Sequence, residues 1–105
     1  MSVRLIIRPA AELDIISAES WYRVRVEELG DQFVAALDAS VDAISLEPER
    51  FPVVYRGFRR ALLRRFPYAV FFSATPTVVF LVACIHLRRD PRFVRERLRR
   101  EGGVA

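Results

Sequence analysis

The N-terminal part of the chain carries its apolar residues at the spacing of a helix. A short apolar run at residues 3–8 comes first and predicts a strand. The residues that then recur at three- and four-residue steps are Leu13, Ile16, Ser20 and Val24. This period predicts a helix over residues 9–27, with Pro9 in the first turn, where its missing N–H costs no hydrogen bond.

A second helical pattern follows Gly30 and Asp31. We interpret the glycine as the end of the first helix and the aspartate as the cap of the second. The apolar positions of the second pattern are Phe33, Leu37, Val41 and Ile44. These positions predict a helix that runs to about Leu46 and is closed by Pro48, so the first half of the chain is expected to form a helical hairpin.

The hydrophobic period changes in the second half of the chain. Residues 50–57 are expected to form a loop that holds Pro52 and Gly57. Strands are predicted at residues 58–66, 68–74 and 78–85, with a turn at 75–77. The last of these strands is apolar on both faces, which indicates a central position. A short arginine-rich helix over residues 91–100 follows Asp90, and residues 102–105 are expected to fray.

This order of elements, β-α-α-β-β-β-α, predicts a fold of the α+β class. We expect a single domain over residues 1–105, in which the helical hairpin packs on one face of a small, mainly antiparallel sheet. The other face is expected to be partly open and framed by arginines.

The charge of the chain is unevenly distributed. The sequence has 17 basic residues, all of them arginine, and a net charge of +4. Residues 1–49 hold four arginines and ten acidic residues, a net of −6, and residues 50–105 hold thirteen arginines and three acidic residues, a net of +10. The basic half is expected to attract nucleic acid or an acidic protein, and the charge alone does not separate the two.

Several absences in the sequence bear on cofactors and compartment. Cys84 is the one cysteine and lies in an apolar run, so we expect a buried small residue, no disulfide within the chain and a reducing, cytoplasmic setting. One histidine and one cysteine do not make a metal site, and no glycine-rich phosphate loop is present, so no cofactor is expected.

Residues 66–87 are uncharged and long enough to span a membrane. Their middle is polar and broken by Pro76, which favours two strands and a turn over a transmembrane helix.

Three stretches of the sequence resemble the RelE/ParE family of toxins from type II toxin–antitoxin modules. They are RPAAELD at residues 8–14, RRFPYAVFF at residues 64–72 and ACIHLRRDP at residues 83–91. The resemblance covers about residues 3–98. It implies a growth-inhibiting toxin of the plasmid-stabilisation type, neutralised by a cognate antitoxin in a toxin–antitoxin hetero-oligomer.

The resemblance implies two different activities. RelE-like members cut messenger RNA on the ribosome, and ParE-like members poison DNA gyrase. The basic positions of the RelE-type set keep Arg60 and Arg88 here but fall on Leu62 and Ala69 elsewhere. The terminal tyrosine of that set falls near Phe93 and Val94. These losses favour a ParE-like binder of gyrase over a ribonuclease, with a decayed toxin that only binds its antitoxin as a third reading.

Proton transfer is the weak point of a ribonuclease reading, because arginine is always protonated and makes a poor base. The tentative catalytic residues are His86, Arg88 and Arg60. An alternative for His86 is a structural role at the end of a strand, and Asp90 is interpreted as a helix cap rather than a catalytic acid. The tentative residues for binding target or antitoxin are Arg59, Arg60, Arg64, Arg65, Arg88, Arg89 and Arg92, some of which are expected to be merely solvated surface.

Overall fold

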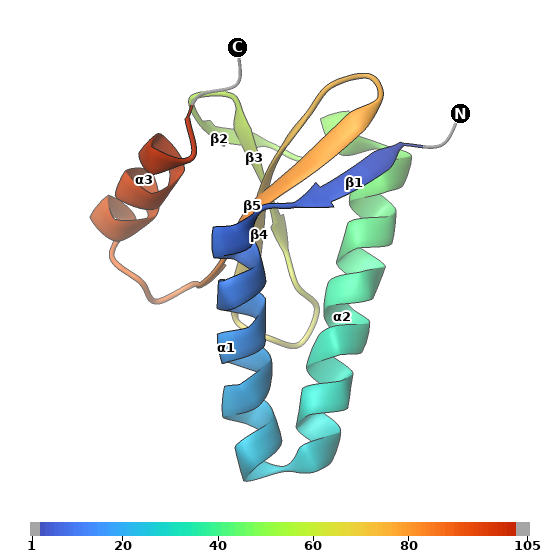
Figure 1. Ribbon diagram of the computed structural model, residues 1–105, viewed down its shortest axis with the longest axis vertical. Coiled ribbons are helices and arrows are strands. Elements are labelled where there is room, and N and C mark those ends of the chain that lie inside the picture. Colours follow the sequence, from blue (N-terminus) through green and yellow to red (C-terminus); the bar gives the residue numbers. More distant parts are fainter. Residues whose placement is uncertain (1–2, 103–105) are drawn as a thin grey trace.

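Five strands form one mixed sheet in the order β1-β5-β4-β3-β2. The computed structural model describes residues 3–102, shown in Figure 1. The strands are β1 (Arg4–Ile7), β2 (Val53–Tyr55), β3 (Phe58–Leu62), β4 (Tyr68–Ala74) and β5 (Val78–His86). The helices are α1 (Pro9–Arg25), α2 (Glu27–Leu46), the single 3-10 turn η1 (Pro48–Arg50) and α3 (Pro91–Arg100). The predicted α+β class and the order of the main elements are confirmed.

β5 lies between β1 and β4, as its apolar sequence predicted. It pairs with β1 in parallel and with β4 in antiparallel register. Residues 81–85 are buried, because helices cover both faces of this strand. The register with β4 shifts at Phe71 and Phe72, so Val82 has no direct partner on β4. The other pairings, of β2 with β3 and of β3 with β4, are antiparallel.

The helical hairpin and α3 cover opposite faces of the sheet. On the hairpin side, Phe33 and Ile44 of α2 pack with buried residues of β4 and β5 such as Phe72 and Leu81. On the other face, Leu98 of α3 belongs to a second core, with partners that include Phe58, Phe71 and Ile85. Figure 1 shows α1 and α2 side by side and α3 separate from α2. The second face is therefore partly closed by α3.

The turn of the hairpin differs from the prediction. The helices break at Val26, whose backbone is extended (φ −147°, ψ 119°), and Gly30 lies inside α2, where it is buried. A side chain at this position would begin 2.8 Å from Cβ of Arg23. Gly30 therefore permits the close approach of α1 and does not end a helix.

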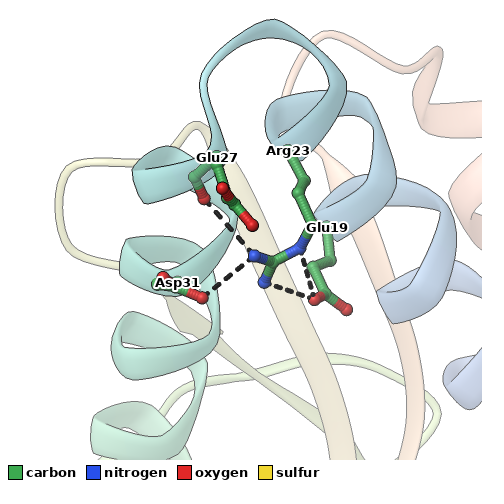
Figure 2. A network of polar contacts seen from close by, with 4 residues as sticks. All are labelled: Glu19, Arg23, Glu27 and Asp31. Atoms are coloured by element: carbon green, nitrogen blue, oxygen red, sulfur yellow. Dashed lines mark hydrogen bonds and ion pairs between the residues drawn. The ribbon is translucent and has the colours of Figure 1, made fainter.

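Arg23 lies beside Gly30 and ties the two helices together. Figure 2 shows its polar contacts. Its guanidinium donates to the carboxylate of Glu19 on α1 at 2.7 Å and to that of Asp31 on α2 at 3.0 Å. It also donates to the backbone carbonyl of Glu27 at 3.4 Å. Asp31, predicted to cap the second helix, instead binds Arg23 across the hairpin.

The apolar stripe that predicted α1 does not face the core. Leu13 is 68% exposed, Ile16 49% and Val24 84%. The helix buries Ala11 and Ala18 instead. The three- and four-residue spacing of the apolar residues predicts the position of the helix correctly. The helix face that carries them is exposed, however, and the opposite face is buried.

The predicted loop over residues 50–57 begins at the last residue of η1 and contains the edge strand β2. Arg56 (φ 45°) and Gly57 (φ 85°) both have left-handed backbone and join β2 to β3 in a two-residue hairpin. The predicted strand 58–66 is shorter, because β3 ends at Leu62 and the following chain turns Leu63 and Phe66 into the hairpin-side core.

The uncharged stretch of residues 66–87 forms β4, a turn and β5, as predicted. Among the helices in residues 3–102, none combines the length and apolarity needed to cross a membrane. The prediction of a frayed tail falls mainly on residues 103–105, which lie outside the described residues.

Candidate target-binding groove

α3 and the second face of the sheet enclose a groove of about 240 Å³, which we call the α3 groove. Buried Ala69 and Phe71 of β4 and Leu98 of α3 line its apolar part. The basic residues that line it are Arg60, Arg89 and Arg95. Guanidinium groups beside an apolar floor suit a partner that presents carboxylates or phosphates next to apolar groups.

The basic surface continues along α3. Arg95 also lines a neighbouring hollow of about 210 Å³. The other arginines of that hollow are Arg56, Arg92 and Arg99. Residues 92, 95 and 99 are three and four positions apart, so the helical period places them on one side of α3.

A larger cleft of about 600 Å³ lies between α1 and α3. Its aromatic lining residues are Trp21, Tyr22, Tyr68 and Phe93. The guanidinium of Arg89 lies 3.6 Å from the centre of the Phe93 ring. His86 and Arg89 line both this cleft and the α3 groove, so the two hollows meet at the end of β5.

A bidentate ion pair fixes α3 to the body of the protein. The guanidinium of Arg97 donates to the two carboxylate oxygens of Asp14 on α1 at 3.0 and 2.8 Å. Oδ2 of Asp14 also accepts from the backbone N–H of Cys84 at 3.0 Å, and Arg97 donates to the carbonyl of Val82 at 3.4 Å. The register of β1 ends opposite Leu81, so this pair binds backbone groups of β5 beyond the end of β1. The hydrogen bonds to Asp14 raise the pKa of Arg97.

Asp90 begins α3 in the predicted way. Its carboxylate accepts from the backbone N–H of Arg92 at 2.8 Å, and Pro91 takes the first helical position. The guanidinium of Arg92 binds the same carboxylate at 3.0 Å. These bonds from Arg92 hold the pKa of Asp90 below its usual value. The cap orients α3 at the mouth of the α3 groove.

His86 ends β5 and is held by local contacts. Its Nδ1 accepts from the backbone N–H of Arg88 at 3.0 Å. Its ring meets Tyr68 edge-on, with the ring centres 5.1 Å apart. Burial raises the pKa of Tyr68, so this phenol stays protonated at neutral pH. These contacts agree with the structural reading of His86.

The predicted binding arginines occupy different places. Arg60 and Arg89 line the α3 groove, and Arg92 lines the neighbouring hollow. Arg59 donates to the backbone carbonyl of Phe51 at 2.6 Å and so braces the chain before β2. The predicted residues that are exposed and line neither the α3 groove nor the neighbouring hollow are Arg64, Arg65 and Arg88.

The tentative ribonuclease residues are only partly brought together. Arg60 and His86 line the α3 groove, whereas Arg88 contributes its backbone N–H to His86. Leu62 and Ala69, where the RelE-type set has basic residues, are direct partners across β3 and β4. This pair is apolar, with Leu62 exposed and Ala69 buried.

Three further residues that line the groove, Arg95, Tyr55 and Val54, are not among the predicted binding residues. The spacing of Arg95 from Arg92 along one side of α3 was the available signal for the first. Tyr55 and Val54 belong to β2, whose residues fall within the predicted loop of residues 50–57, so no strand pattern marks them.

Comparison with known proteins rests on structure alone. No model of a protein family matches the chain, and no curated protein matches it. Eleven chains of solved structures do match. One of them, described as "Chromosomal ParDE TA system from P. aeruginosa", has a TM-score of 0.72 and 16% identity, over 83% of this chain and 98% of that one.

This chain shares the fold of that ParDE chain. This likeness confirms, at the level of the fold, the RelE/ParE resemblance that the three motifs carried. The order of the three helices and the five-stranded mixed sheet is consistent with this shared fold.

Proposed function

We propose that this chain is the toxin of a type II toxin–antitoxin module and inhibits growth by binding DNA gyrase in the cytoplasm. The observation that carries the proposal is the fold shared with the ParDE chain, combined with a basic groove at which two of the RelE-type basic positions are replaced by the apolar pair Leu62 and Ala69. The protein acts by occupying a surface of its target, without chemistry of its own and without a cofactor.

The α3 groove is the proposed contact surface. Arg60, Arg89 and Arg95 supply fixed positive charge, and the apolar floor at Ala69 and Phe71 supplies area that leaves water on binding. Since arginine forks bind carboxylates and phosphates alike, the groove suits acidic protein surface and DNA backbone, both of which a gyrase–DNA complex presents.

A cognate antitoxin is the second proposed partner. The net charge of +4, with +10 in residues 50–105, favours fast association with an acidic polypeptide. Occupation of the basic surface by such a partner blocks the target and forms a toxin–antitoxin hetero-oligomer.

A ribosome-dependent messenger RNA endoribonuclease is the second candidate. Arg60 and His86 line one groove, which is the observation in its favour. Against it, Nδ1 of His86 already accepts a backbone hydrogen bond, and burial raises the pKa of neighbouring Tyr68, so a proton acceptor is poorly provided.

Growth after induced expression tests the proposal. We expect arrest with the wild-type chain, loss of arrest in Arg60→Ala with Arg95→Ala, and retained arrest in the control Arg4→Ala, which changes an exposed arginine of β1. His86→Ala separates the candidates, because a binder keeps its toxicity without that imidazole. Loss of toxicity in a folded His86→Ala variant, with messenger RNA cleavage by the wild type, contradicts the gyrase proposal.

A further inference from the structure

Strand β5 continues beyond the end of β1 without a neighbouring strand on that side. The chain that follows β1 makes its last bond to this edge at the carbonyl of Leu81. Two side chains bind the next backbone groups. Arg97 donates to the carbonyl of Val82 at 3.4 Å, and Asp14 accepts from the N–H of Cys84 at 3.0 Å. The ion pair of Asp14 and Arg97 therefore lies along β5 where a longer β1 would continue.

One acceptor and one donor on this edge remain open to the cleft between α1 and α3. Successive residues of a paired strand direct their backbone groups to opposite sides. The N–H of Cys84 points to α1, whereas that of Leu87 donates to Pro67, just before β4. The carbonyl of Cys84 and the N–H of His86 therefore point away from β4. None of the hydrogen bonds that tie β5 to helices and turns within residues 3–102 uses either group.

This edge has room for one planar polar group rather than for another strand. The groups on either side are already occupied, because Asp14 holds the N–H of Cys84 and the N–H of Arg89 donates to the carbonyl of His86 at 3.0 Å. A nucleobase carries a donor and an acceptor side by side on its Watson–Crick edge, and proteins bind extruded bases through this edge. Such an edge matches the carbonyl of Cys84 and the N–H of His86.

Aromatic side chains stand on both sides of the open edge. On the hairpin side, Tyr22 of α1 and Tyr68 of β4 have ring centres 6.3 Å apart, and both pack against the hairpin-side core. Trp21 of α1 extends this wall of the cleft. On the other side, Phe93 of α3 packs against the second core. A flat base in line with the strand edge therefore has rings on both of its faces, and stacking between aromatic rings is a common way to hold a base.

The charged residues of the cleft leave it positive. Asp14 and Arg97 line it but neutralise each other in their ion pair. Arg89 is exposed, and its guanidinium lies 3.6 Å from the centre of the Phe93 ring. This contact holds a positive charge beside the α3 wall. A guanidinium binds phosphate oxygens through paired hydrogen bonds, so an anionic group attached to the base has a partner here.

We propose that the cleft between α1 and α3 binds a purine nucleotide, with the base on the backbone of Cys84 and His86 and the phosphate on Arg89. The volume of about 600 Å³ lies in the range of small-molecule sites. A purine offers the larger face to the two aromatic walls. The site adjoins the α3 groove but is a separate hollow. The proposal does not depend on the toxin function proposed above, which needs no nucleotide.

Fluorescence titration of the purified full chain with AMP and with GMP tests the proposal, because the one tryptophan, Trp21, lines the cleft. We expect saturable quenching with a dissociation constant of about 0.1–1 mM for at least one of them. Ribose phosphate lacks the base, and purine riboside monophosphate lacks the exocyclic group of the base edge. Each is expected to bind at least about tenfold more weakly, because stacking or one hydrogen bond is lost.

Arg89→Ala is expected to weaken nucleotide binding about tenfold. Arg64→Ala is the matched control, since Arg64 is exposed and lines none of the three hollows. Circular dichroism confirms that both variants fold. Three results overturn the proposal. They are no saturable quenching by either nucleotide up to about 10 mM, equal binding of ribose phosphate, and equal effects of Arg89→Ala and Arg64→Ala.

An unpaired base within a nucleic acid strand offers the same edge and phosphate. A single strand of four adenylates is therefore titrated beside AMP. Equal affinities, counted per nucleotide, support a site for a free nucleotide. Much tighter binding of the strand overturns that assignment in favour of single-stranded nucleic acid. The analogues act on the unaltered chain, so these outcomes do not depend on whether a variant folds.

Discussion

Asp14→Asn tests how α3 is held in place. The carboxylate of Asp14 accepts three hydrogen bonds, two from Arg97 at 2.8 and 3.0 Å and one from the backbone N–H of Cys84 at 3.0 Å. Asparagine keeps one oxygen acceptor and turns an NH₂ group toward a donor. The substitution therefore breaks the bidentate geometry and leaves Glu101 as the remaining acidic group that acts on the guanidinium of Arg97.

The expected cost follows from burial. Removing one partner of a fully buried ion pair costs about 3–5 kcal/mol. The side chains of Arg97 and Asp14 keep 14% and 20% exposure, so water rehydrates part of the guanidinium. One acceptor also remains. We therefore expect the free energy of unfolding to fall by about 2–3 kcal/mol, with a thermal midpoint lower by roughly 10 °C.

Urea denaturation followed by circular dichroism measures this loss, and amide hydrogen exchange locates it. We expect faster exchange in α3 than in α2, because the ion pair joins α3 to α1 and β5. Asp38→Asn removes an exposed carboxylate of α2 and serves as the control. A loss below about 0.5 kcal/mol, equal to that of the control, would refute the stabilising role of the pair.

Three further variants or measurements test other parts of the structure. Alanine in place of glycine normally stabilises a helix, but in Gly30→Ala the new Cβ meets Arg23. We therefore expect urea denaturation to show a free energy of unfolding lower by about 1–2 kcal/mol. A higher free energy of unfolding would contradict the close approach of the two helices. Asp90→Ala removes the cap of α3, and differential scanning calorimetry should show a midpoint lower by about 3–5 °C. Burial raises the pKa of Cys84 to about 12, so its labelling by a thiol reagent at pH 8 should be limited by unfolding; rapid labelling of the folded chain would show an accessible thiolate.

Local signals in the sequence predicted the secondary structure well. The cap at Asp90 and the apolar run of β5 are readable because each depends on neighbouring residues. The two errors at the hairpin have one physical cause, since Gly30 is there for the approach of Arg23 from another helix. A glycine inside a pattern does not show whether it ends a helix or admits a neighbour.

The candidate site was predictable in composition more than in geometry. The ion pair of Asp14 and Arg97 joins residues 83 positions apart, and no pattern in a single sequence connects them. The sequence alone therefore does not distinguish Arg97 from the other arginines near the C-terminus. Arg60 and Arg89 were predicted as binding residues, but which arginines share a groove depends on where α3 packs against the sheet.

The most direct test of the proposed function is a supercoiling assay with purified gyrase, ATP and relaxed plasmid. We expect the wild-type chain to inhibit supercoiling and to trap double-strand breaks, and we expect the Arg60→Ala, Arg95→Ala variant to lose both effects. Unimpaired supercoiling in excess protein, with cleavage of messenger RNA on ribosomes by the same preparation, would contradict the account.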